Sequence, residues 1–281
     1  MNGEATLRDG TPVAADRTYK TCTVQDLLSL EGNTTVITGG GRGIGLALAF
    51  AVAQAGSNVA VIDALLEPHE DFAELKNFGI KAKYYKVDVT EHAQIIGVFR
   101  AIADEFSGID GCITAAGIVL DKPFLEHGWD ETMKVQMVNQ MGTFFCAQEA
   151  AKHMKSRGKG SIIMISSIAA TMAIPAQTMP AYGASKAFVK SLSVHLGVEL
   201  GPFNIRVNSI SPGYIRTDMT AKVGLQSPRL LELFTDAPPM KKMGERTDLM
   251  GAAVYLLSEA SAYTTASDMM ITGGLHAGRF D

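Results

Sequence analysis

A tyrosine and a lysine four residues apart are the pair in this sequence best suited to proton transfer. In the stretch MPAYGASKAF, Tyr182 and Lys186 would lie on one face of a helix, one turn apart. A tyrosine hydroxyl has an ordinary pKa of about 10 and is a poor acid or base near neutral pH. A lysine ammonium one turn away favours the phenolate and lowers that pKa. The same spacing occurs by chance on helices, so the alternative interpretation is an amphipathic surface pair.

A glycine-rich loop is suited to binding phosphate. The stretch TGGGRGIG, residues 38–45, lies between a β-branched run and an apolar helical segment. Glycines permit a tight turn, and the N–H groups at the start of a helix attract anions. The literal G-x-G-x-x-G pattern is absent, and T-G-x-x-x-G-x-G stands in its place. The loop predicts a dinucleotide site, and the alternative is an ordinary turn between a strand and a helix.

Two charged residues near this loop give opposite indications about the cofactor. Asp63 ends the second predicted strand, eighteen residues after Gly45, where an acid can accept hydrogen bonds from ribose hydroxyls and repel a 2′-phosphate. Arg42, inside the loop, could instead hold that phosphate. No basic residue follows Asp63 in ALLEPHED, so NAD is the favoured cofactor and NADP remains possible. Asp63 could alternatively cap the helix that follows.

The elements that must position these residues alternate along the chain. Short, nearly continuous apolar runs are typical of strands buried on both faces, and longer helical segments separate them. This alternation predicts an α/β fold: a single-domain, doubly wound (Rossmann-type) parallel sheet of about seven strands with helices on both faces. The predicted strands are 34–38, 58–63, 81–88, 111–116, 161–166, 205–210 and 268–272; the predicted helices include 44–55, 91–106, 130–155, 182–200 and 247–258.

Two segments fall outside this alternation. Residues 1–30 are expected to form an N-terminal extension, and residues 31–281 the dinucleotide-binding domain. Within that domain the proline-containing stretch 211–245 reads as an excursion that could cover a site.

The composition excludes several classes of protein. A net charge of −4 without a basic tract argues against nucleic acid as the main partner. No apolar run approaches the roughly 18 residues of a membrane span, and the N-terminus lacks the apolar core of a secretory signal. Three widely spaced cysteines indicate reduced thiols, which suits a cytoplasmic protein. His153, His195 and His276 lack metal-ligand spacing, so no metal site is expected.

A series of motifs in a fixed order extends these observations. After the glycine loop come Asp88-Val89, TAAG (114–117), N-x-x-G (139–142), SIIMISS ending at Ser167, the Tyr182 and Lys186 pair, and NSISPGYIRT (208–217). In this order the sequence resembles the short-chain dehydrogenase/reductase family over about residues 30–275. Each motif alone is weakly specific, and their joint order is very specific.

The resemblance implies roles for four side chains. Tyr182 would be the general acid or base, because a carbonyl that accepts hydride develops negative charge and needs a proton donor. Lys186 would lower the tyrosine pKa and hold the nicotinamide ribose. Ser167 would bind the substrate oxygen, and Asn139 would bind a water that links Lys186 to solvent. Without the resemblance, an alternative interpretation is that Ser167 caps a turn and that Asn139 bonds a neighbouring carbonyl.

The resemblance also implies a cofactor-binding set, which lines the nucleotide from adenine to nicotinamide. It comprises Gly39, Gly41, Arg42, Gly43, Ile44, Gly45, Asp63, Asp88, Val89, Ala115, Ala116, Gly117, Tyr182, Lys186, Pro212, Gly213, Ile215 and Thr217.

Departures from the family pattern narrow the resemblance. Ala115 replaces a common asparagine, and fifteen residues separate Ser167 from Tyr182 where thirteen is commoner. The longer loop is most similar to the fungal polyol branch of the family, the arabinitol dehydrogenase, sorbose reductase and mannitol dehydrogenase types. That branch implies a ketose–polyol substrate, although the apolar loop fits a hydrophobic ketone equally well. An enoyl reductase fits less well, because that branch spaces its tyrosine and lysine further apart.

These observations predict an NAD(P)-dependent oxidoreductase that interconverts a secondary alcohol and a ketone, a small molecule, with Tyr182 as general acid/base. Two alternatives stay open: a nucleotide-binding scaffold or sensor without turnover, and a dedicated biosynthetic ketoreductase of a secondary-metabolite pathway. The resemblance implies a homotetramer or homodimer formed through the helices that carry Asn139 and Tyr182. The sequence equally allows those helices to be buried against the sheet alone.

Overall fold

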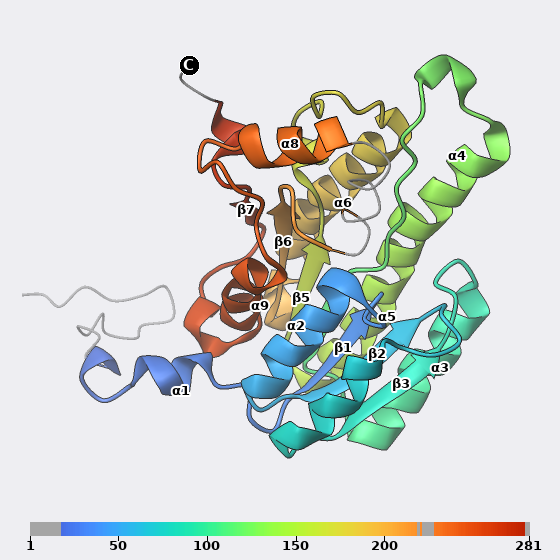
Figure 1. Ribbon diagram of the computed structural model, residues 1–281. Helices are drawn as coiled ribbons and strands as arrows, with labels where there is room; N and C mark the ends of the chain where they lie inside the picture. The colour runs from blue at the N-terminus through green and yellow to red at the C-terminus, as the bar shows by residue number, and fades with distance from the viewer. Residues whose placement is uncertain (1–17, 218–219, 221–227, 279–281) are drawn as a thin grey trace, which may run out of the picture.

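Seven parallel strands form the centre of the protein, in the order β3-β2-β1-β4-β5-β6-β7 (Figure 1). The computed structural model describes residues 18–217, 220 and 228–278. The doubly wound sheet expected from the alternation of apolar runs is confirmed. The strands are β1 Thr34–Thr38, β2 Asn58–Asp63, β3 Ala82–Lys86, β4 Gly111–Thr114, β5 Gly160–Ile165, β6 Ile205–Pro212 and β7 Asp268–Ile271.

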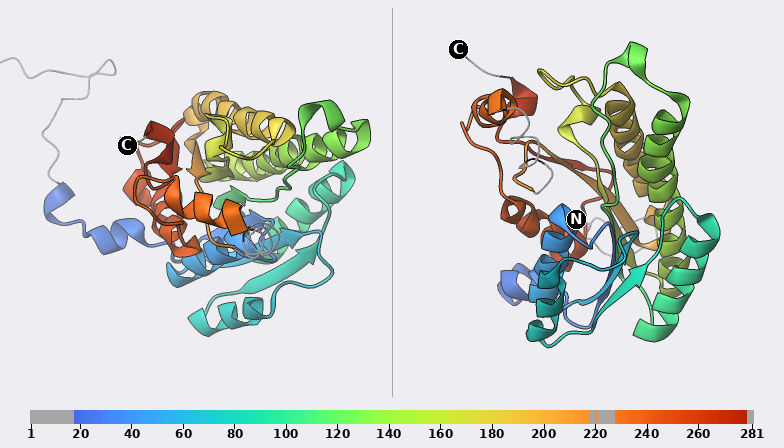
Figure 2. Two further views of the ribbon diagram at one scale, coloured as in Figure 1. Left: turned by 45° about the horizontal axis from the view of Figure 1, so that its top comes forward. Right: turned by 45° about the vertical axis from the view of Figure 1, so that its right-hand side comes forward.

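Helices cover both faces of the sheet (Figure 2). The α-helices are α1 Val24–Leu28, α2 Gly43–Gln54, α3 His92–Phe106, α4 Trp129–Gln136, α5 Thr143–Arg157, α6 Pro180–Glu199, α8 Pro228–Asp236 and α9 Met250–Leu257. The 3-10 segments are η1 Thr18–Lys20, η2 Glu70–Phe78, η3 Phe124–Glu126, η5 Ile168–Ala170, η6 Gly201–Phe203, η7 Arg246–Leu249, η8 Glu259–Ser261 and η9 Leu275–Ala277; η4 Met137–Gly142 is a π-helix.

Burial on both faces explains why the central strands are continuously apolar. All five residues of β1 and all four of β4 are buried. One core cluster joins the sheet to α3, α5 and α6, and another joins it to α2 and α9. The catalytic candidates therefore stand on a rigid, close-packed base.

Some boundaries differ from the expected ones. The expected helix 130–155 is divided into α4, the π-helix and α5. The strand expected at 205–210 continues to Pro212, because Ser211 and Pro212 pair with Met270 and Ile271 of β7. Pro212 is tolerated there because pairing with β5 has already ended at Ile165 and Ile210, so its missing N–H breaks no bond to that strand.

The structure describes part of each of the two segments that fall outside the alternation of strands and helices, 1–30 and 211–245. Of the expected extension 1–30, residues 1–17 lie outside them, and Leu30 is buried in the α2–α9 core. Of the expected excursion 211–245, residues 218–219 and 221–227 lie outside them. Helix α8 packs through Phe234, whose ring stacks on Tyr214 at a centroid distance of 4.3 Å. Together with Ile168, Ile174, Met243 and Leu275 these two residues form a third apolar cluster.

Within the part of the chain that the structure describes, no helix combines the length and apolar character needed to cross a membrane. In the same residues no three His, Cys, Asp or Glu side chains gather to hold a metal ion.

Candidate active site

The carboxyl ends of the central strands bring the four catalytic candidates together. Ser167 follows β5 by two residues and caps the first turn of η5, accepting a bond from Ala169 N at 3.1 Å. Tyr182 and Lys186 lie on α6, which packs against β5, β6 and η5. The strand order reverses between β1 and β4, and ligands of such sheets bind in the crevice at that point.

Tyr182 has a partly buried phenol close to the Ser167 side chain. Burial raises the pKa of this phenol, and the Ser167 hydroxyl lowers it by a smaller amount. The net direction is opposite to the lowering expected from the neighbouring lysine. The Lys186 ammonium lies 5.8 Å from the centroid of the tyrosine ring and donates its bond elsewhere. In the protein alone, desolvation of the phenolate is therefore the larger effect.

Lys186 is almost entirely enclosed, with 4% of its surface exposed. Its Nζ donates to the carbonyl of Ile165, the last residue of β5, at 2.9 Å. Burial disfavours the charged form and lowers its pKa from 10.5 to about 8. A lysine with this pKa can both release and take up a proton near neutral pH.

Asn139 lies in the π-helix and is fully buried. Its amide forms a closed pair with the backbone of Ile118: Oδ1 accepts from Ile118 N and Nδ2 donates to Ile118 O, both at 2.9 Å. Nδ2 also donates to Ser185 Oγ at 2.9 Å, so both of its hydrogens are used. The side chain thus fixes the segment after β4. π-Helical turns of this kind are frequent at functional sites.

Gly117 lies close to two of these residues. A Cβ added there would stand 3.3 Å from Lys186 Nζ and 3.4 Å from Asn139 Oδ1. A larger residue at this position would therefore crowd the lysine, and glycine keeps the backbone of TAAG directly beside it.

The glycine loop is packed tightly on one side and open on the other. A Cβ on Gly45 would lie 2.1 Å from the Gly39 carbonyl oxygen, and one on Gly39 would lie 2.6 Å from Ala116 Cα. Gly43, at the start of α2 with φ +60°, has nothing near its missing Cβ. The first turn of α2 carries no acidic residue and no side-chain cap, so its N–H groups can bind phosphate oxygens. The loop fits a dinucleotide.

Asp63 holds the glycine loop in place. Its carboxylate accepts from Gly41 N at 2.9 Å and from Leu65 N at 3.1 Å. Burial of the Tyr84 hydroxyl, and to a smaller extent the negative charge of Asp63, raise the pKa of that hydroxyl to about 12. Arg42 is exposed, and its side chain forms no hydrogen bond or ion pair within the described residues.

The other expected cofactor residues line the same edge of the sheet. Asp88 is exposed and accepts from Thr90, while Val89 is buried against Gly142. Ala115 and Ala116 donate their backbone N–H groups to Thr38, whose Oγ1 takes the second bond at 3.3 Å. This bond ties the segment down despite the absent asparagine side chain.

The residues after β6 form the opposite border of the crevice. Pro212 ends the strand, and Gly213 packs closely on β7, since a Cβ there would lie 2.8 Å from Thr272 Cα. Ile215 is buried and bridges to Gly244, and Thr217 bonds Thr220. Ile44, in the first turn of α2, packs on the α2–α9 core.

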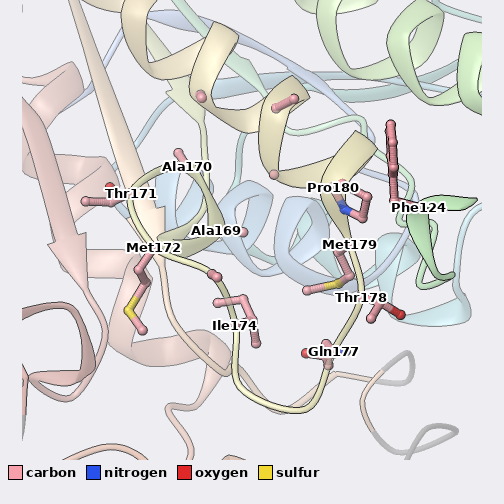
Figure 3. Close-up of a pocket in the computed structure, with 14 residues that line it drawn as sticks. Phe124, Ala169, Ala170, Thr171, Met172, Ile174, Gln177, Thr178, Met179 and Pro180 are labelled. Atoms are coloured by element: carbon pink, nitrogen blue, oxygen red, sulfur yellow. The ribbon is translucent and has the colours of Figure 1, made fainter.

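The loop after Ser167 carries contacts that the sequence did not indicate. Thr171 Oγ1 accepts from Lys190 Nζ at 3.2 Å, and Gln177 and Thr178 donate to Asp121. On the outer flank of α6 this loop borders a pocket of about 550 Å³, where Phe124, Met172 and Met179 lie (Figure 3). Neither Tyr182 nor Lys186 lines that pocket, because both lie on the opposite flank of the helix.

Asp121, Lys190, Thr38 and Ser185 were missed by the sequence interpretation. Their partners are distant in sequence, and no local spacing marks them. The four catalytic candidates and the glycine loop, by contrast, come together as the motifs suggested.

Known proteins share both the sequence and the fold. The family described as enoyl-(acyl carrier protein) reductase matches residues 39–276. A sorbose reductase of Schizosaccharomyces pombe is 38% identical over 88% of this chain and 97% of its own. An NADP-dependent mannitol dehydrogenase of Hypocrea jecorina is 34% identical over 89% and 94%. The crystal structure of a short-chain type dehydrogenase/reductase from Mycobacterium marinum is 37% identical, with a TM-score of 0.84 over 90% of this chain and 99% of that one. The chain belongs to the short-chain dehydrogenase/reductase family, whose members of the fungal polyol type are among its relatives, and it is an NAD(P)-dependent oxidoreductase that interconverts alcohols and ketones.

Proposed function

We propose that this oxidoreductase interconverts a ketose and the corresponding polyol, with Tyr182 as the general acid/base. The observation that carries the assignment is the placement of the Tyr182 phenol beside the Ser167 hydroxyl and a buried Lys186 with a pKa of about 8. The polyol class is supported by the sorbose reductase and mannitol dehydrogenase among the relatives.

In the proposed mechanism each side chain has a separate task. The bound nicotinamide cofactor supplies or accepts the hydride. Ser167 holds the substrate oxygen at the Tyr182 hydroxyl, which donates its proton as negative charge develops on that oxygen. Lys186 then returns a proton to the phenolate, directly or through water, because its pKa lies close to neutrality. Asn139 acts by fixing Ile118, and so the wall beside Lys186.

Replacing the phenol tests this assignment. Tyr182→Phe should fold and bind NAD(H) as the wild type does, and lose turnover on the best substrate of a panel of ketoses, polyols and cyclic ketones. Ser167→Ala should lower kcat with the same cofactor affinity. If Tyr182→Phe keeps full turnover, the proposed acid/base is wrong.

For the cofactor we propose a preference for NAD, with NADP as a poorer substrate. The Asp63 carboxylate stands against Gly41 at the loop, where it would repel a 2′-phosphate. The unpaired Arg42 and the name of the Hypocrea relative favour NADP instead. Initial rates with NADH and NADPH decide between them, and Asp63→Ser should shift the ratio of kcat/KM values towards NADPH.

The wider assembly is also a proposal. Helix α6 exposes 41% of Val194 and 71% of Val198, which supports pairing of this helix in a homodimer or homotetramer. Light scattering measures the mass directly. The three cysteines are free, which supports a reducing, cytoplasmic setting. Residues 1–30 as an extension, and 211–245 as the cover of the substrate site, complete the proposed organisation.

A further inference from the structure

Asp121 joins the two loops that leave the ends of β4 and β5. Its Oδ1 accepts from Thr178 N at 2.8 Å and from Thr178 Oγ1 at 3.2 Å, and its Oδ2 accepts from Gln177 Nε2 at 3.0 Å. Beside it, Lys122 N donates to Thr178 O at 2.7 Å. We call these four contacts among Asp121, Lys122, Gln177 and Thr178 the Asp121 clamp. Three of the four use the aspartate carboxylate, an ionised acceptor that makes strong bonds.

Both sides of the clamp lead directly to catalytic candidates. On one side, Ile118 stands three residues before Asp121 and is fixed by the Asn139 amide. On the other side, Tyr182 stands four residues after Thr178, in the first turn of α6. The clamp therefore connects the wall beside Lys186 to the start of the helix that carries the phenol.

The start of α6 has little local support of its own. Its N-cap residue, Met179, makes no side-chain cap, and the first turn contains no acidic residue. Pro180, the first helical residue, has no N–H to bond. The carboxylate of Asp121 supplies negative charge near this helix terminus, which the helix dipole favours. The contact at Thr178 adds to the bond that Gln136 Nε2 donates to Ala181 O at 3.3 Å, so the first turn is held from both sides.

The loop between Ser167 and α6 is held at a second point. Lys190 Nζ donates to Thr171 Oγ1 and pairs with Asp268 Oδ2 at 3.0 Å. Between the two anchored points the loop is apolar, and Ala176 adopts φ +59°. With Thr171 and Thr178 both fixed, the loop is anchored at two points between Ser167 and Tyr182.

We propose that Asp121 is a positioning residue for this reaction, and that it sets the place of the Tyr182 phenol relative to Ser167 and the substrate oxygen. The inference rests on the proposed role of Tyr182. Proton transfer requires hydrogen-bond distances in the reacting complex, and a displacement of about 1 Å lowers rates by as much as about 100-fold. Loss of the clamp should affect this step and leave the glycine loop and cofactor affinity unchanged.

Asp121→Ala, with Asp130→Ala as the matched control, tests the proposal. Asp130 is also an exposed acid near the same loop, and its carboxylate forms no hydrogen bond or ion pair in the described part of the chain. We expect Asp121→Ala to lower kcat by about 10- to 100-fold, to move the tyrosine-dependent limb of the kcat–pH profile, and to keep the Kd for NADH from calorimetry. Asp121→Asn retains the acceptor for Thr178 and should restore most of kcat. Gln177→Ala breaks only one contact of the clamp and should lower kcat by a smaller factor. This variant provides the test if Asp121→Ala folds poorly.

Several results would overturn the inference. Equal kcat and pH profiles in Asp121→Ala and Asp130→Ala would show that the clamp does not position the phenol. A parallel fall in kcat, NADH affinity and thermal midpoint would indicate a merely structural contact. Tyr182→Phe measured in parallel separates the two levels: an active Tyr182→Phe refutes the proposed function, whereas an inactive one with a normal Asp121→Ala refutes only the positioning role.

Discussion

Replacing Lys186 by methionine should separate the destabilisation that its buried charge causes from its contribution to catalysis. The ammonium is buried, and its pKa falls from 10.5 to about 8 on folding. Below about pH 8 Lys186 is charged in the folded and in the unfolded chain, and the folded chain bears the whole cost of burying the charge. Between about pH 8 and 10.5 the unfolded chain holds the proton and the folded chain releases it, so the wild type gains stability as the pH rises.

The magnitude follows from the shift. At neutral pH the penalty is about 3 kcal/mol, and at about pH 9.5 it has fallen to about 1.5 kcal/mol. Lys186→Met has no such group, but it removes the donor to the Ile165 carbonyl, a loss of about 1–2 kcal/mol at every pH. We therefore expect the variant to be about 1–2 kcal/mol more stable than the wild type near pH 7, an advantage that vanishes near pH 9.5.

The assay is urea unfolding followed by circular dichroism, at one protein concentration and at both pH values. Turnover should be lost in the variant at either pH. The decisive quantity is the difference in unfolding free energy between the two proteins, since it cancels groups that titrate equally in both. A difference that stays constant from about pH 7 to about 9.5 would refute the burial argument for Lys186.

Three further outcomes follow from the contacts around the site. Asn139→Ala should lower the unfolding free energy by about 2–4 kcal/mol in urea titrations, because it leaves the Ile118 N–H and C=O without partners; a loss below about 0.5 kcal/mol would contradict that role. Gly45→Ala should abolish NADH binding in calorimetry, since its Cβ would overlap the Gly39 carbonyl, while Gly97→Ala on α3, with open space around it, should bind normally. Tyr214→Phe should be neutral or stabilise by about 1 kcal/mol in thermal unfolding, because the Tyr214 hydroxyl is buried and finds no partner among the described residues, and clear destabilisation would show that it has one.

The sheet could be predicted because its signals are local. The runs at 34–38 and 58–63 are apolar because both faces of β1 and β2 are covered, and their predicted limits coincide with the observed ones. The π-helix at Met137–Gly142 could not be predicted, since a single widened turn has no distinct apolar period. The extension of β6 to Pro212 depends on pairing with β7, which is remote in sequence.

In the site, too, local features could be predicted from the sequence and contacts between remote residues could not. Glycines, tyrosine and lysine at fixed spacings indicated the type of chemistry, and the structure brings them to one edge of the sheet. The direction of the Tyr182 pKa shift could not be predicted, because it is set mainly by the burial of the phenol, which depends on the tertiary packing around α6. The Asp121 clamp was missed because its partners lie more than fifty residues away.

The first residue of α4, Trp129, can serve as an intrinsic fluorescence probe. Trp129 is the only tryptophan of the chain, and it is 78% exposed, in the same loop-to-helix connection that begins at Asp121. Its emission therefore comes from a single known place. Reduced nicotinamide absorbs where an indole emits, so binding of NADH should quench this emission by energy transfer. Changes in that quenching would report the distance between the β4–α4 connection and the cofactor, without any added label.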